Sequence, residues 1–250
     1  MNRYLIQFKK KIKSFLRGPL SLGVYFKDYF SFKKLSKGKN RDFSMGVKYL
    51  YPCLRDKTGE VSSDLHYIYH PAWAARIIAK NKPDFHVDIS SILYFPAIVS
   101  AFVPVKYYEF REANIYLDNL TAGQADLLSL PFPNDSVKSI FCMHTIEHIG
   151  LGRYGDPIDV NGDLKAIKEL KRVLAPGGSL LFVAPIGKPR IYFNAHRVYS
   201  YSQIMNYFSD LTLKEFSLIP KGGGIIYNAS QDLSDKEDYG CGCFWFIKTS

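Results

Sequence analysis

The chain has 250 residues, of which 47% are hydrophobic and 15% aromatic, and its formal net charge is +10. This composition is typical of a globular protein and excludes a largely disordered chain. No apolar run approaches the roughly 20 residues of a membrane-spanning helix. The four cysteines make no recognisable disulfide framework, so we expect a reduced, cytoplasmic protein.

The positive charge is concentrated at the start of the chain. Residues 1–41 hold 12 Lys and Arg residues against one acid, whereas the rest of the chain holds 21 basic and 22 acidic residues. A nearly neutral main part is not typical of a nucleic-acid-binding domain, so we expect no nucleic-acid partner. Residues 1–17 place apolar side chains at helical spacing among lysines. This pattern indicates a helix that either lies on an anionic membrane, at its inner face, or packs on the protein itself.

We therefore divide the chain into a basic amphipathic arm with a linker, residues 1–45, and one domain, residues 46–250. Within the arm, Lys, Gly and Ser residues predict a linker at 31–48. The elements predicted after it are, in chain order, a helix at 73–80, strands at 85–89, 106–110, 120–125 and 137–143, a helix capped by Asp163, a strand at 179–184, a helix at 201–208, and strands at 211–219 and 243–249.

Strands that alternate with helices predict βαβ units and a mainly parallel sheet. The closing strand, glycine turn and strand indicate an antiparallel edge. The stretch 137–185 is the most informative, because its buried strand is followed by a glycine-rich loop loaded with polar side chains. Ligand sites in open parallel sheets lie outside the carboxyl ends of the strands. The sequence therefore predicts a site in this loop.

The loop also contains the pattern H-x-x-E-H, formed by His144, Glu147 and His148. On a helix this pattern would direct two histidines at one zinc ion, with the glutamate as general base, as in a zinc hydrolase. Gly150 and Gly152 follow too soon for a long helix, and no third ligand is evident, so we expect no metal. Zinc hydrolysis remains the lesser alternative.

Several motifs carry a resemblance to known proteins. Leu-Lys-Arg-Val-Leu-Ala-Pro-Gly-Gly at 170–178 and Ala-Asp-Leu-Leu-Ser-Leu-Pro-Phe at 125–132 resemble class I S-adenosylmethionine-dependent methyltransferases. More narrowly, the pair 66–67 (HY) and the stretches 147–157 (EHIGLGRYGDP) and 193–197 (FNAHR) are similar to domain-of-unknown-function family 268. The resemblance implies a Rossmann-like α/β fold: a mainly parallel seven-stranded sheet with helices on both faces and an antiparallel edge strand, after a helical N-terminal extension.

The resemblance also implies S-adenosylmethionine as the cofactor. In this superfamily an acid and a glycine-rich turn follow the first strand, whereas here two serines replace the glycines. Acids after the second and third strands would accept hydrogen bonds from the ribose hydroxyls and the adenine amine. The residues that the pattern assigns to the cofactor are Asp88, Ser90, Ser91, Glu109, Asp126, Leu127 and His144.

The same comparison suggests how a methyl acceptor would be bound and activated. Histidine suits the removal of a proton from an acceptor near neutral pH. The candidate catalytic residues are His148, its rival His196, Glu147 as the partner that orients the base, and Asp156. The candidate acceptor-binding residues are Arg153, Tyr154, Arg190, Asn194 and Arg197.

We therefore predict transfer of a methyl group to an oxygen or nitrogen of a sugar, nucleotide-sugar or glycan acceptor, as in polysaccharide biosynthesis. The alternative is a methyltransferase-fold protein without catalysis that serves as a binding or scaffold protein. The missing glycines favour the alternative, and the dense polar loop favours the enzyme.

Overall fold

The computed structural model describes residues 21–37, 39, 43–54, 64–111 and 113–249. Contacts divide the chain into two compact units, Met1–Ser62 and Ser63–Ser250. In the first unit, residues 21–35 form a helix and Val47–Tyr49 a 3-10 turn, η1. The predicted linker is therefore wrong for residues 31–35, which continue the helix. The predicted amphipathic segment at 1–17 lies outside the described residues.

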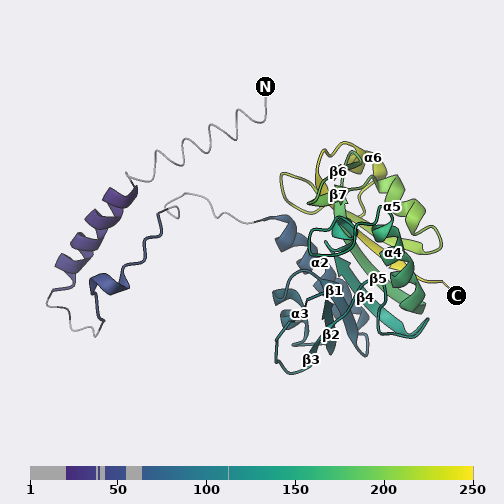
Figure 1. The fold of residues 1–250 in the computed structure, drawn as a ribbon, viewed down its shortest axis with the longest axis horizontal. Helices are drawn as coiled ribbons and strands as arrows, with labels where there is room; N and C mark the ends of the chain where they lie inside the picture. Colours follow the sequence, from purple (N-terminus) through teal and green to yellow (C-terminus); the bar gives the residue numbers. More distant parts are fainter. Residues whose placement is uncertain (1–20, 38, 40–42, 55–63, 112, 250) are drawn as a thin grey trace. The chain divides into compact units, whose positions relative to one another are not determined.

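The second unit is built on a seven-stranded sheet (Figure 1). The strands follow the order β3-β2-β1-β4-β5-β9-β8. All neighbours are parallel except β9, which runs antiparallel to both β5 and β8. The strands of this sheet are β1 (His86–Ser90), β2 (Val105–Glu109), β3 (Leu120–Gln124), β4 (Val137–Met143), β5 (Leu174–Ile186), β8 (Thr212–Ile219) and β9 (Gly240–Ile247). The predicted fold class is confirmed.

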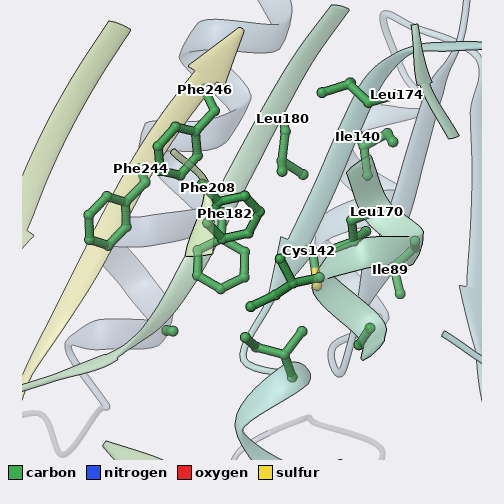
Figure 2. Close-up of a cluster of buried hydrophobic side chains, with 14 of the residues drawn as sticks. Ile89, Ile140, Cys142, Leu170, Leu174, Leu180, Phe182, Phe208, Phe244 and Phe246 are labelled. Atoms are coloured by element: carbon green, nitrogen blue, oxygen red, sulfur yellow. The ribbon is translucent and has the colours of Figure 1, made fainter. Parts of the chain in front are cut away.

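Helices cover both faces of the sheet, because the central strands are apolar on both sides. One core joins α4 and α5 to one face, and its packed phenylalanines include Phe182, Phe208 and Phe244 (Figure 2). A second core joins α2 and α3 to the other face around Trp73 and Phe141. The helices of this unit are α2 (His66–Asn81), α3 (Tyr94–Val99), α4 (Gly162–Val173), α5 (Tyr201–Tyr207) and α6 (Gln231–Asp235).

Two features of the sequence prediction need correction. Asp163 does not cap α4: Asn161 occupies that position, and Asp163 is buried in the first turn, where it accepts a hydrogen bond from the Tyr199 hydroxyl at 2.9 Å. A two-stranded hairpin was also missed. It pairs β6 (Arg190–Tyr192) with β7 (His196–Val198), and we call it the site hairpin. Strands of three residues are too short to show the alternation from which a strand is predicted.

Candidate functional site

Two clefts adjoin at the carboxyl ends of the parallel strands. The first cleft is lined by Ser90 at the end of β1 and Ser91 after it, by Glu109 at the end of β2, by the 126–128 segment after β3 and by the loop after β4. The second cleft is lined mainly by polar and aromatic side chains from the start of α2, the loop after β4 and the site hairpin. Four residues line both clefts: Ser91, His144, His148 and Tyr154. The prediction of a site beyond these strand ends therefore matches two connected clefts.

The turn after β1 is built without glycine and without backbone strain. Positive φ angles are what make glycine necessary in a turn, and none of residues 88–94 has one. Neighbouring strands hold the turn, because the Tyr107 hydroxyl donates to the Ser90 carbonyl at 2.9 Å and Thr145 Oγ1 donates to the Ile89 carbonyl at 3.3 Å. Ser90 and Ser91 thus border the first cleft as predicted, in a conformation that serine adopts freely.

Asp88, in contrast, lines neither cleft. Its side chain is fully buried, and neither carboxylate oxygen has a hydrogen-bond partner in the part of the chain that the structure describes. Burial raises the pKa of Asp88 to about 8, and nearby Ser90 offsets this only in part. The prediction that Asp88 contacts the cofactor therefore does not fit its buried position outside both clefts.

The other two acids border the first cleft as the sequence predicts. Glu109 accepts a hydrogen bond from the Arg111 amide at 3.1 Å and faces its guanidinium at 3.4 Å. Asp126 Oδ1 accepts from the Leu128 amide at 2.9 Å, and the buried Leu127 lies between them. A carboxylate has about four acceptor positions, so both acids retain capacity for a ligand.

His144 and Glu147 form a buried pair beneath the second cleft. His144 Nδ1 lies 2.8 Å from Glu147 Oε1, and its Nε2 lies 3.6 Å from Cys241 Sγ. Burial lowers the pKa of His144, but Cys241 and Glu147 more than offset this and raise it to about 10. Burial likewise raises the pKa of Glu147, yet the hydrogen bond from His144 leaves it lowered. The two side chains are therefore held together as a buried hydrogen-bonded pair.

The backbone at His144 is also unusual. Its φ is 46°, in the left-handed region that few residues other than glycine adopt. Strain of this kind persists only where the surroundings impose it, and it is concentrated at functional sites. His144 follows β4 directly, stacks on the Tyr67 ring at 5.3 Å and meets the His70 ring at 5.1 Å.

The contacts of His148 indicate which ring nitrogen carries the proton. Its Nδ1 lies 2.6 Å from the Ala195 carbonyl, which can only accept, and 3.3 Å from Arg153 Nη1, which can only donate. The much shorter contact with the carbonyl assigns the proton to Nδ1. Nε2 then presents its lone pair, 3.9 Å from Glu147 Oε1. This distance is too long for a hydrogen bond but short enough for the carboxylate to stabilise a proton that arrives on Nε2. His148 therefore lines both clefts with one ring nitrogen anchored to the backbone and the other close to a carboxylate.

Asp156 lines the first cleft and organises the loop after β4. Its carboxylate accepts from the amides of Gly150 at 2.7 Å, Gly152 at 3.3 Å and Tyr154 at 3.2 Å. Burial raises its pKa, but these amide hydrogen bonds leave it lowered. A carboxylate committed to three amides holds the loop and, with it, the side chains that the loop carries.

The predicted acceptor-binding residues separate into two groups. Arg153 and Tyr154 border the second cleft as expected: Arg153 Nη1 donates to the Ala195 carbonyl at 3.1 Å, and its guanidinium lies 5.0 Å from the Tyr154 ring. Arg190 and Asn194 line neither cleft. Arg190 is engaged by the Lys188 carbonyl at 2.8 Å and the Asp238 carbonyl at 2.6 Å.

Arg197 has a structural role that the sequence did not indicate. Its side chain is buried, Nη1 donates to the Ile149 carbonyl at 2.6 Å, and Nε lies 3.6 Å from Asp163 Oδ2. It thereby ties the site hairpin to the loop after β4 and to the first turn of α4. The prediction that Arg197 reads an acceptor anion does not fit this buried position.

His196 lines only the second cleft, where its ring meets those of His148 at 6.3 Å and Tyr239 at 5.7 Å. Sequence reasoning gave no part to Tyr67 or Tyr239, although both line this cleft. The pair His66-Tyr67 belongs to the family-like motifs, and this was the one signal that could have pointed to Tyr67.

The H-x-x-E-H pattern does not form a zinc site. Ile146–His148 is a single 3-10 turn, η2, so the two histidines are not presented from one α-helix. They also face different partners, Glu147 and the Ala195 carbonyl. Among the described residues, no group of three His, Cys, Asp or Glu side chains is placed to hold a metal ion.

Comparison with known proteins agrees with the fold, and a family model matches one part of the chain. A family model described as "Caenorhabditis protein of unknown function, DUF268" matches residues 131–215, a region that holds β4, the loop after it, α4 and the site hairpin. No curated protein matches the chain. No helix in the described part of the chain has the length and apolar character needed to cross a membrane.

Solved structures share the fold at low sequence identity. The 1,6-didemethyltoxoflavin-N1-methyltransferase of Burkholderia thailandensis, solved with S-adenosylhomocysteine, is 9% identical, with a TM-score of 0.54 over 73% of this chain and 79% of that one. The [4+2]-cyclase SpnF is 11% identical, with a TM-score of 0.52 over 72% and 81%. YcgJ of Bacillus subtilis is 18% identical, with a TM-score of 0.50 over 72% and 99%. The chain thus has the class I methyltransferase fold, which one neighbour named as a cyclase also has.

Proposed function

We propose that this protein transfers a methyl group from S-adenosylmethionine to an oxygen or nitrogen of a polar, sugar-type acceptor. The observation that carries the proposal is the position of His148. It lines both clefts, and with the proton on Nδ1 its Nε2 is the nitrogen free to accept a proton from the acceptor. His196 is the weaker candidate for the base, since it lines the second cleft alone.

The first cleft fits S-adenosylmethionine by the chemistry of its lining. Ile89, Phe110 and Leu127 supply apolar surface for the adenosyl group. Glu109 would accept from the ribose hydroxyls and Asp126 from the adenine amine. The strain-free Ser90–Ser91 turn lets the backbone approach the amino acid portion. When bound, the cofactor supplies an electrophilic methyl group on a sulfonium centre.

Side chains of the protein accept the proton of the acceptor and stabilise the charge that results. His148 Nε2 takes the proton of an acceptor hydroxyl as that oxygen becomes nucleophilic, while the Ala195 carbonyl keeps Nδ1 protonated and the ring in place. Glu147 Oε1, 3.9 Å away, stabilises the imidazolium that results. Arg153 and Lys221 line the second cleft and favour an acceptor with a negatively charged group.

Isothermal titration of the full chain with S-adenosylmethionine and S-adenosylhomocysteine tests the cofactor. Binding in the micromolar range is the expected result, and absence of binding of both compounds would overturn the proposal. A second experiment follows release of S-adenosylhomocysteine with a panel of sugar phosphates and nucleotide sugars. Binding of the cofactor without turnover of any acceptor would favour the alternative of a binding protein without catalysis.

A further inference from the structure

Two polar side-chain atoms at the second cleft are buried without a hydrogen-bond partner. They are Glu147 Oε2 and His196 Nε2, and no group in the described part of the chain bonds to either. Glu147 is 1% exposed. A buried polar atom without a partner costs about 1–3 kcal/mol, so such atoms are rare and call for an explanation. A ligand that supplies the missing partner is one such explanation.

The chemistry of these atoms defines what the ligand must present. Glu147 Oε1 is engaged by His144, so Oε2 is the oxygen left to accept. His148 Nε2 is a second acceptor, because Nδ1 holds the proton. The two side chains are close, with Glu147 Oε1 3.9 Å from His148 Nε2. Two acceptors side by side require two neighbouring donors on the ligand.

Charge distinguishes hydroxyl donors from ammonium donors. Glu147 already accepts a hydrogen bond from His144 at 2.8 Å. Of the other charged residues that line the cleft, Arg153 and Lys221 are cationic and Asp64 is anionic. The two cations disfavour a cationic ligand, whereas neutral hydroxyls are not repelled by them. The rings of Tyr67 and Tyr239 add flat apolar surface that suits the C–H face of a sugar.

We propose that the second cleft binds a saccharide through two neighbouring hydroxyl groups, one donating to His148 Nε2 and the other to Glu147 Oε2. Glu147 then decides which hydroxyl of the sugar is presented to the base. The inference rests on the proposed function for the reacting hydroxyl only. The binding of the diol can be measured without any methyl transfer.

The test is saturation-transfer NMR on the full chain without cofactor. The probes are glucose 1-phosphate and galactose 1-phosphate, chosen because Arg153 and Lys221 line the cleft, together with their monodeoxy analogues. We expect at least one parent sugar to bind, and removal of either of two adjacent hydroxyls to weaken binding about tenfold, since hydrogen bonds to charged groups are strong. Absence of binding of both parents, or equal binding of all deoxy analogues, would overturn the inference.

Glu147→Gln sharpens the test, because it keeps the shape and removes the charge. We expect the substitution to weaken binding of the parent sugar about tenfold. Binding of the deoxy analogue that lacks the hydroxyl facing Glu147 should be unchanged. Asp210→Asn removes a surface carboxylate paired with Lys171 and serves as the matched control. If Glu147→Gln does not fold, the deoxy series on the unmodified chain still decides. If the sugar binds and S-adenosylmethionine does not, only the proposed methyl transfer is refuted. If S-adenosylmethionine binds and no sugar does, only the proposed saccharide site is refuted.

Discussion

The two clefts are built on different principles, although they share four lining residues. The first collects groups at the ends of four neighbouring parallel strands, β3, β2, β1 and β4, so their convergence is a property of the sheet. The second collects groups from the start of α2, the loop after β4, the site hairpin and the segment before β9. The fold supplies the first cleft, whereas particular side-chain contacts hold the second together. The second is therefore where single substitutions should have specific effects.

The largest effect is expected at His148, which lines both clefts. His148→Ala should lower turnover by about 10²–10⁴-fold, because a positioned general base contributes that much. Binding of S-adenosylmethionine should remain, since Glu109 and Asp126 are untouched. Release of S-adenosylhomocysteine with the best acceptor of the panel measures turnover, and titration measures affinity. If turnover survives in His148→Ala and is lost in His196→Ala, the base has been assigned to the wrong histidine.

Arg197→Ala should destabilise the fold by about 3 kcal/mol, because it leaves Asp163 buried without its partner cation. Arg153→Ala is the matched control: this arginine is exposed, so its free energy of unfolding should change by less than about 0.5 kcal/mol. Urea denaturation of both variants makes the comparison. Equal stabilities would show that the second cleft does not depend on the buried arginine.

Asp88→Asn should stabilise the protein in a pH-dependent way. The folded-state pKa of about 8 lies above the ordinary value of 3.8, so the folded state holds its proton where the unfolded state has lost it. Stability from this group is complete below pH 4 and is lost as the pH rises toward 8. The variant should therefore match the unmodified chain near pH 4 and exceed it by about 5 kcal/mol at pH 8, because each unit of pKa difference corresponds to about 1.4 kcal/mol.

Urea denaturation at these two pH values checks this prediction. Affinity for S-adenosylmethionine should be unchanged in Asp88→Asn, because Asp88 lines neither cleft. A loss of affinity would show that Asp88 contributes to cofactor binding, as the sequence pattern predicted.

Glu109→Ala and Asp126→Ala should each weaken the binding of S-adenosylmethionine about tenfold, because each removes one hydrogen bond to a charged group. Isothermal titration measures the change. Saccharide binding without cofactor should be unaffected in both, since neither residue lines the second cleft. Weakened saccharide binding in Glu109→Ala would mean that the two clefts act as one site.

The sequence predicted the sheet well, because its strands are short apolar runs bounded by turn residues. The residues of the first cleft could be placed for the same reason: Glu109 and Asp126 follow strands that could be recognised. The glycine-less turn was a misleading signal. Its backbone needs no positive φ, a fact that residue types alone do not reveal.

The second cleft was only half predictable. His148 and His196 stood out by residue type, but Tyr67 and Tyr239 lie far apart in the chain and no local pattern joins them. Arg197 was misassigned because arginine is rarely fully buried and an exposed position is the usual expectation. Its partner, Asp163, was mistaken for a helix cap for a similar reason, since acids are common at that position.

The carbonyl of Ala195 has a consequence of its own. It is the acceptor that keeps the proton of His148 on Nδ1, and it lies in the turn of the site hairpin, not in the sheet. A displacement of that turn would release Nδ1 and allow the proton to move to Nε2, where it would block the lone pair. The position of one backbone carbonyl in the hairpin turn therefore determines which nitrogen of His148 is available to accept a proton.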